Sequence, residues 1–444
     1  MAEPWRIDSA MPGIVWPGLP APAATLGLLQ QLEDTQWWPP ERLHEMQSRQ
    51  LDLLLRHAHE TVPYYRERWK ARPTASDLPD LPILTRAELQ AQYGALQSRR
   101  VPAAHGRVSE GTTSGTSGMP VRVRQTELVG LLWNVFTLRD HLWHRRDLRG
   151  KLATVRINIE AGAKDNWGPA TTGLARTGPV VFRGVDADAS ALLDWLGDEK
   201  PDCLLTYPTL AAELAALSLE KGRALKLAEV RTFGEMLRAG VHELCREAWG
   251  AKLTDIYSAV ELGNIALQCP EGERYHVQSE GVVVEVLDDE GRPCPPGTVG
   301  RLVMTSLHNF AMPLIRYEIG DYAEAGAPCS CGRGLPVISR IAGRARGMLT
   351  APDGKRYWPY FGSRGLLDVA PVKQMQVVQK DRELLEVRLV VASPLSGDQE
   401  ERLRRHLHAD LPAGLKLAFS YWERIPRSAG GKFEDFYSEI GQNS

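Results

Sequence analysis

The alternation of helix-like and strand-like segments from Val121 to Tyr257 constrains the fold of this chain most. Apolar residues at helical spacing alternate there with short apolar runs that are typical of strands. Strands separated by helices of this length predict βαβ units and a mostly parallel sheet, whose binding sites gather at the carboxyl ends of the strands. The helix patterns cover 127–143, a segment closing with 194–199, 209–221 and 241–249, and the strand patterns cover 203–207, 230–233 and 253–257.

A different pattern begins after Gly281. Two strand-like runs within 281–307 are joined by Asp-Glu-Gly and Pro-Pro-Gly turn signals, which predicts an antiparallel β element and a separate lobe. Strand patterns at 374–379 and 386–391 and a helix pattern at 398–411 predict a compact tail. Before 100, the one helix pattern is near 41–58.

The predicted fold is therefore α/β. A large N-terminal domain, 1–342, combines βαβ subdomains with the β lobe, and a small α+β domain follows at 348–444. The Gly- and Arg-rich stretch 343–347 is the predicted hinge between them.

Composition excludes several classes of partner. The 444 residues are 43% hydrophobic and 24% charged, typical of a globular chain long enough for two or three domains. A formal net charge of −2 provides no basic field for nucleic acid or a membrane surface. No run approaches the roughly 18 apolar residues of a membrane span, and the N-terminus lacks a basic segment followed by an apolar one. We therefore expect a cytoplasmic protein, without nucleic-acid or membrane partners, that holds any anion locally.

The loop "EGTTSGTSGMPV" at 110–121 is rich in glycine, threonine and serine. Glycines allow close backbone approach and the hydroxyls add donors, so such a loop can wrap phosphate oxygens. It is not a Walker loop, because Gly-Lys-Ser/Thr is missing and 121–124 alternate like a strand. From composition alone, a flexible surface loop remains the alternative.

Two cysteine-containing pairs suggest a metal. Cys269 and His276 form a C-x6-H pair, and Cys329 and Cys331 form a C-x-C pair. Three thiolates and an imidazole suit tetrahedral Zn²⁺, and a closed set of four ligands is structural. The alternative is four unrelated residues. The other cysteines are interpreted as ordinary thiols.

Several motifs, taken in order, resemble those of the adenylate-forming superfamily, and most closely those of phenylacetate–CoA ligases. The resemblance spans roughly 100 to 432, and motif order makes it more specific than any single match. The matching stretches are "TSGTSGMP" at 113–120, "YSAVE" at 257–261, "PLIRYEIGD" at 313–321, "GR" at 343–344 and "IPRSAGGK" at 425–432.

The resemblance implies that a carboxylate and ATP form an acyl-adenylate and pyrophosphate. It implies that Tyr257 stacks on adenine, Asp321 binds the ribose hydroxyls and Arg344 reaches the nucleotide from the domain junction. Glu261 would carry Mg²⁺, aided by Thr116, and Lys432 would be the catalytic group, brought in by a mobile C-terminal domain. The residues implied to hold the β- and γ-phosphates are Ser114, Gly115, Thr116, Ser117 and Gly118.

Each of these residues also has an interpretation without a role in catalysis or binding. Glu261 and Lys432 could be solvated surface charges, and Gly320-Asp321 could be a simple turn. The chain also departs from the family at Met119, where lysine is common, and in the hinge, which lacks the usual acidic residues. The second half-reaction, which depends on domain rotation, is the step that this hinge puts in question.

The resemblance implies an AMP-forming acid–thiol ligase with an aryl or arylacetyl acid as substrate and CoA as acceptor. We expect the acid near 207–209, 232–235 and 257–262. Transfer to a carrier-protein thiol or an amine in natural-product biosynthesis is one alternative, and a catalytically reduced nucleotide-binding protein is another. The oligomeric state is open, with a homodimer among the alternatives.

Overall fold

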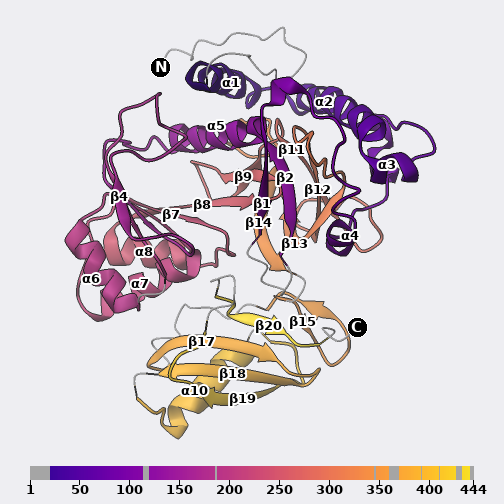
Figure 1. Cartoon of the computed structure of the whole chain (residues 1–444). Helices are drawn as coiled ribbons and strands as arrows, with labels where there is room; N and C mark the ends of the chain where they lie inside the picture. The colour runs from indigo at the N-terminus through magenta and orange to yellow at the C-terminus, as the bar shows by residue number, and fades with distance from the viewer. Residues whose placement is uncertain are drawn as a thin grey trace.

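The computed structural model describes residues 21–113, 120–185, 188–344, 347–359, 370–391, 393–409, 411–426 and 433–440. They form a large domain and, below it in Figure 1, a small one. None of the described helices is both long and apolar enough to cross a membrane. The predicted α/β fold with a small C-terminal α+β domain is confirmed.

A single sheet runs through the whole large domain. In the described residues it has twelve strands, in the order β11-β12-β13-β14-β10-β9-β8-β7-β6-β3-β5-β4. Their bounds are β3 Leu152–Val155, β4 Gly162–Lys164, β5 Val180–Arg183, β6 Cys203–Thr206, β7 Glu229–Phe233, β8 Lys252–Ala259, β9 Gly263–Gln268, β10 Tyr275–Val277, β11 Val282–Leu287, β12 Val299–Ser306, β13 Tyr317–Ala325 and β14 Val337–Arg344.

The two halves of this sheet differ in strand direction. β5, β3, β6, β7 and β8 are parallel, as the sequence predicts, whereas β9 to β14 pair antiparallel. The prediction of a separate β lobe is wrong in one respect: β8 and β9 pair antiparallel and join both halves into one sheet. The turn between them holds Glu261.

Helices cover both faces of the parallel strands (Figure 1). α6 (Ala189–Glu199), α7 (Pro208–Glu220) and α8 (Val241–Trp249) bury leucines and alanines against β3, β6, β7 and β8. α5 (Glu127–Trp143) packs on the opposite face with α1 (Ala21–Thr35). α7 begins with proline, whose fixed φ suits a first helical position.

The N-terminal segment is more helical than its sequence pattern predicts. The predicted helix near 41–58 is α2 (Pro40–Thr61), and three other helices accompany it. These are α1, α3 (Pro63–Arg68) and α4 (Arg86–Ala91), with short 3₁₀ turns η1 at Ala75–Asp80 and η2 at Ala103–His105.

The small domain is a four-stranded sheet with one helix against it. Its strand order is β19-β18-β17-β20, in which β17 and β18 are antiparallel and the two outer pairs are parallel. α10 contributes Leu403 and Leu407 to the core. Its elements are β17 Val372–Gln379, β18 Leu384–Val391, α10 Gly397–His408, β19 Lys416–Tyr421 and β20 Phe436–Ser438, preceded by the short pair β15 Leu349–Thr350 and β16 Arg356–Tyr357.

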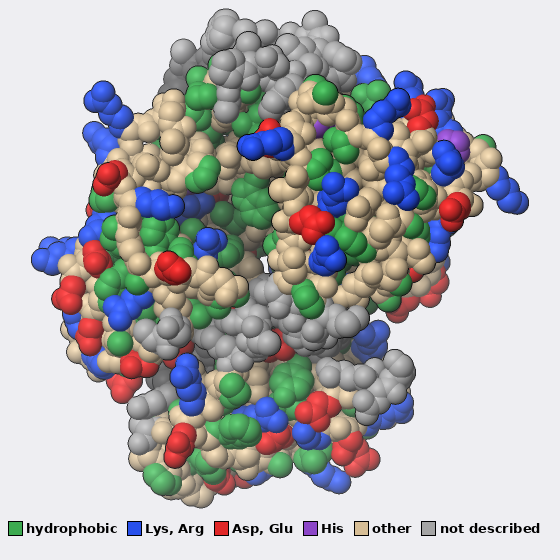
Figure 2. Space-filling model, in the orientation of Figure 1, with side chains coloured by type: hydrophobic (Ala, Val, Ile, Leu, Met, Phe, Trp, Pro, Cys, Tyr) green, Lys and Arg blue, Asp and Glu red, His purple; other side chains and the backbone are tan. Residues whose placement is uncertain are grey.

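Charges of both signs are spread over the face that Figure 2 shows. Lys and Arg side chains lie among Asp and Glu side chains on both domains. This distribution agrees with the small net charge of −2. The notable charges are therefore those in the interior, where burial strengthens their interactions.

Candidate active site

The parallel strands β3, β6, β7 and β8 end at one edge of the sheet, and polar and aromatic residues follow them there. Tyr207 comes directly after β6, and its ring lies 5.1 Å from that of Phe233 at the end of β7. The Tyr207 hydroxyl accepts a hydrogen bond from the N–H of Ile157, two residues past β3, at 3.3 Å. Such a carboxyl edge is where open α/β sheets bind ligands.

A hairpin stands against this edge. β1 (Val108–Thr112) and β2 (Arg122–Thr126) pair antiparallel, and Thr113 and Val121 continue the pairing. Gln125 donates a hydrogen bond to the carbonyl of Val260 at 2.7 Å, so the hairpin is fixed beside the turn that carries Glu261. The predicted phosphate-binding residues 114–118, and Met119, fall in the connection between β1 and β2 but lie outside the described residues.

Glu261 is not a solvated surface carboxylate. It lies in the turn between β8 and β9 and is only 4% exposed. Burial raises its pKa, and the nearest cation is Arg86, whose Nη1 lies 3.9 Å from its Oε1. Burial away from water destabilises the charged form of a carboxylate, and a cation bound beside it stabilises that form.

Tyr257, Asp321 and Arg344 lie together, as their predicted common role requires. The Tyr257 hydroxyl donates to Asp321 Oδ2 at 2.8 Å, and Arg344 Nε donates to Asp321 Oδ1 at 3.2 Å. Asp321 and Arg344 face each other across β13 and β14. The predicted stacking of Tyr257 on adenine stays a prediction, as does the ribose contact of Asp321.

The small domain approaches the same edge. Lys432, like residues 345 and 346 of the predicted hinge, lies outside the described residues. The residue after it, Phe433, is described, and its backbone N–H donates a hydrogen bond to Glu235 Oε1 at 3.0 Å. Glu235 follows β7, so the chain next to the predicted catalytic lysine meets the carboxyl edge.

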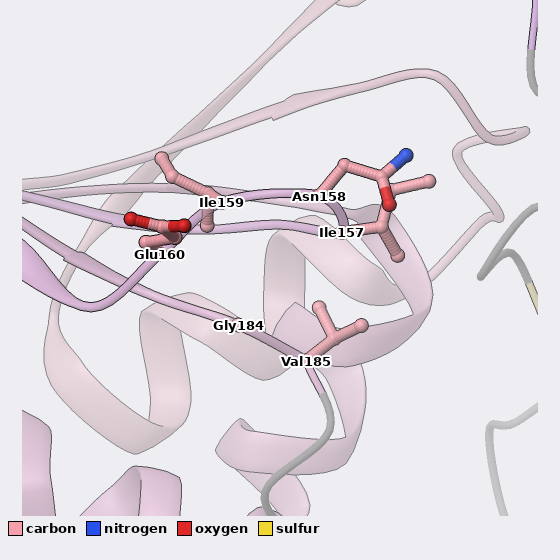
Figure 3. A pocket seen from close by; sticks show the side chains of 6 residues that line it. All are labelled: Ile157, Asn158, Ile159, Glu160, Gly184 and Val185. Carbon is pink, nitrogen blue, oxygen red and sulfur yellow. The ribbon is translucent and has the colours of Figure 1, made fainter.

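An open pocket of about 510 Å³ continues this edge beyond β6. Figure 3 shows Ile157 and Val185 directed into the space between the segments that follow β3 and β5. Asn158, Glu160 and Gly184 also line it. Sequence reasoning missed these residues because it did not predict β3 or β5, each only four residues long.

The four predicted zinc ligands are brought together from two distant stretches. Cys269 directly follows the strand β9, His276 lies in β10, and Cys329 and Cys331 lie between β13 and β14. Their ligand atoms all lie within 4.8 Å of one another. The Sγ atoms of Cys269 and Cys329 are 3.8 Å apart, and Cys331 Sγ lies 3.3 Å from His276 Nε2.

These distances test the fit of a metal. A disulfide needs about 2.05 Å between sulfurs, so Cys269 and Cys329 are not bonded. Two thiolates bound tetrahedrally at about 2.3 Å from Zn²⁺ would lie about 3.8 Å apart, which is the separation found. Burial lowers the pKa of His276 to about 4, which keeps its imidazole in the neutral form that binds metals.

Known protein families match parts of both domains. Residues 111–312 match the family of AMP-binding enzymes, and residues 366–438 match the CapK C-terminal domain. The first match contains the end of β1, all of β2, the parallel strands and Glu261, and the second contains most of the small domain. Together with the relatives below, these matches make the chain similar to adenylate-forming enzymes over most of its length.

Among its sequence relatives are phenylacetate–coenzyme A ligases. That of Thermus thermophilus is 27% identical over 448 residues, which cover 89% of this chain and 96% of the relative. That of Aromatoleum evansii is 26% identical over 364 residues, covering 74% of this chain and 76% of the relative.

Among solved structures, 2-hydroxyisobutyryl-CoA ligase shares the fold. In its postadenylation state in complex with 2-HIB-AMP it superposes with a TM-score of 0.72, at 20% identity and with 91% of each chain covered. In its thioesterification state with 2-HIB-AMP and CoA the TM-score is 0.57, at the same identity and coverage.

Proposed function

We propose that this protein activates a carboxylic acid with ATP and passes the acyl group to CoA, and that the acid is an aryl or arylacetyl acid. It is an AMP-forming acid–CoA ligase related to phenylacetate–CoA ligases. The observation that carries the proposal is the gathering of Tyr257, Asp321, Arg344 and Glu261 beside one hairpin at the carboxyl edge of the sheet.

Formation of the acyl-adenylate requires positive charge in the site. A carboxylate oxygen attacks the α-phosphorus of ATP and pyrophosphate leaves, so two anions must approach each other. In our proposal, Lys432 bridges the carboxylate and the α-phosphate and stabilises the charge that develops between them. In the second step, the thiol of CoA attacks the acyl carbonyl and AMP leaves.

The nucleotide-binding roles follow from the geometry of the described residues. Asp321 has both oxygens oriented by donors, which leaves its remaining lone pairs to accept from the two ribose hydroxyls. Arg344 places a positive charge beside it. The hairpin connection 114–118 then holds the phosphates, and Glu261 holds Mg²⁺, a hard cation that prefers oxygen ligands and would neutralise the phosphate oxygens.

The aryl preference is supported by the aromatic pair Tyr207 and Phe233 at the edge and by the relatives' activity on phenylacetate. We propose structural Zn²⁺ at Cys269, His276, Cys329 and Cys331, tying the end of β9 to the connection between β13 and β14. We also propose that the protein acts in the cytoplasm, where both ATP and CoA are available.

The arrangement of the two domains corresponds to the first step. The higher TM-score to the postadenylation structure, 0.72 against 0.57 for the thioesterification structure, supports this interpretation. We propose that the small domain rotates about the hinge near Gly343 before CoA attacks, as closing and reopening domains do in other enzymes.

Carboxylate-dependent exchange of pyrophosphate into ATP tests the first step. We expect exchange with phenylacetate or a related aryl acid and a loss of about 10²-fold or more in Lys432→Ala, because a charge-stabilising donor is removed. Lys416→Ala is the matched control, since Lys416 is an exposed lysine of the same domain, paired with Glu383.

The outcomes separate the alternatives. If ATP binds but no acid supports exchange, the protein is a catalytically reduced nucleotide-binding protein and the proposal fails. If exchange occurs, mass analysis of products formed with CoA, a carrier protein or an amine identifies the acceptor. A thioester of CoA is expected, and acyl transfer only to a carrier protein or an amine would contradict the ligase assignment.

A further inference from the structure

Glu235 joins the two domains at the active-site edge. Its Oε2 accepts hydrogen bonds from the Thr209 hydroxyl at 2.6 Å and from the Thr209 N–H at 3.2 Å, at the start of α7. Its Oε1 accepts from the N–H of Phe433 at 3.0 Å. One carboxylate therefore links a helix start in the large domain to the backbone of the small one.

The bond to Phe433 restrains its neighbour through covalent geometry. The N–H of Phe433 and the carbonyl of Lys432 belong to the same planar peptide unit. A hydrogen bond to that N–H therefore restrains the peptide that precedes Phe433. The acceptor, in turn, is held in place by Thr209.

Further contacts reinforce the same docking. Arg238, three residues after Glu235, forms an ion pair with Asp435, two residues after Phe433, and the side chains of this pair are only 18% and 25% exposed. On α7, Glu213 accepts a hydrogen bond from Gln374 of β17 at 3.3 Å. The large-domain partners in these contacts lie on α7 or in the loop between β7 and α8.

The loop between β7 and α8 also lies beside the first residue of the predicted hinge, Gly343. Gly343 has a φ of +109°, and a Cβ atom at this position would lie 3.3 Å from the sulfur of Met236. In this loop, Glu235 and Arg238 contact the segment after Lys432, and Met236 lies beside Gly343, where the chain leaves the large domain. Rotation about this point would break all of these contacts together.

We propose that Glu235 is a positioning residue for the adenylate-forming step, in which it holds the peptide after Lys432 while Arg238 and Asp435 hold the same segment. This inference rests on the proposed function. Because the contacts exist only while the small domain is docked, they serve the first step and are released for the second.

The two half-reactions test the proposal separately. Adenylate formation is measured by pyrophosphate exchange, and the second step by thioester formation from a synthetic acyl-adenylate and CoA. For Glu235→Ala we expect exchange to slow by about tenfold or more, the cost of losing an oriented contact to a charged group. Thioester formation should change by less than about threefold, because this contact is already broken there.

Two other variants sharpen the result. Glu235→Gln should be intermediate, because its amide oxygen can accept from Phe433 but its NH₂ group cannot accept from Thr209. Glu247→Ala is the matched control, an exposed glutamate on α8. Equal losses in both half-reactions, or unchanged exchange in Glu235→Ala, would overturn the positioning role.

Hydrogen exchange of the 433–438 backbone, measured with ATP bound and the acid omitted, tests the contact without turnover. We expect faster exchange in Glu235→Ala than in Glu247→Ala, and equal rates would overturn the proposal. A wild-type protein without pyrophosphate exchange would refute the proposed function, whereas the hydrogen-exchange comparison would still report on Glu235.

Reversing the charges of the ion pair tests the second contact. Arg238→Asp and Asp435→Arg should each lower the rate of adenylation as single changes, and the double variant should recover it.

Discussion

Two carboxylates, the half-buried Asp321 and the buried Glu261, have different partners in the candidate active site. Asp321 receives hydrogen bonds from Tyr257 and Arg344. Glu261 forms its ion pair with the guanidinium of Arg86, 3.9 Å away, and burial raises its pKa. The first arrangement suits an acceptor for hydroxyls, and the second suits a ligand for a cation that arrives with the substrate.

Replacing Asp321 by asparagine should weaken ATP binding by about tenfold or more, because a charged acceptor of ribose hydroxyls is lost. Tyr257→Phe removes only one donor to that acceptor and should weaken binding by less than about tenfold. Calorimetric titration with ATP in the absence of acid measures both. Equal affinities of Asp321→Asn and wild type would show that Asp321 does not contact the nucleotide.

Asp255, in β8, predicts a pH effect on stability. Burial raises the pKa of Asp255 to about 6, although Thr232 and Tyr275 donate hydrogen bonds to it at 2.5 and 2.7 Å. The folded state therefore holds a proton that the unfolded state releases near its ordinary pKa of 3.8. Stability should fall as the pH rises from about 4 to about 6, by about 3 kcal/mol in total from this group.

Asp255→Asn should remove that contribution. The amide stays neutral, and the Thr232 hydroxyl can turn toward the carbonyl of Thr254, 3.3 Å away, and accept from the amide. Urea unfolding at pH 4.5, 5.5 and 6.5 should give a flatter dependence than in wild type or in the exposed control Asp289→Asn. Parallel dependences of wild type and Asp255→Asn would show that Asp255 does not titrate in this range.

At the scale of elements, a cluster of cysteine and histidine side chains between strands is the main unusual feature. The cysteine and histidine cluster joins the end of β9, the strand β10 and the connection from β13 to β14. These segments belong to the antiparallel half of the sheet, whose order places β10 between β9 and β14. A metal at this point would hold the register of the strands that carry Asp321 and Arg344.

Purified protein should contain about one equivalent of zinc, and Cys331→Ser should lose it with a fall in Tm of about 5 °C or more. Cys294→Ser is the matched control. Cys294 and Cys329 line one surface pocket, but Cys294 does not belong to the cluster of four predicted ligands. Metal analysis and thermal unfolding measure the two effects. Cys331→Ser with full zinc content and unchanged Tm would contradict a metal at the cluster.

The elements also show which parts of the fold sequence patterns predict. Long amphipathic runs such as α5 and α2, and apolar runs between helices such as β7, were predictable because each carries its own periodicity. β3 and β5 have four residues each, too few to show a period. The junction of β8 with β9 was not predictable, because strand pairing depends on contacts that local pattern does not specify.

At the scale of the whole molecule, the site is built from parts far apart in the chain. Family motifs predicted the convergence of Tyr257, Asp321 and Arg344, and the structure places them in contact. Sequence patterns placed Glu235 near the acid, but they did not predict the contacts of Glu235 and Arg238 with the small domain, because these partners are nearly two hundred residues away. The contacts between the two domains are therefore the part of the site that only the structure revealed.

The path of the carboxylate oxygen tests the central claim most directly. Turnover of aryl acid doubly labelled with ¹⁸O, together with ATP and CoA, should give AMP that carries one ¹⁸O atom, because the oxygen that attacks the α-phosphorus leaves with AMP when CoA attacks the carbonyl. Mass spectrometry of the nucleotide measures this label. Unlabelled AMP, or release of ADP and labelled phosphate, would show that the acid is not activated as an adenylate.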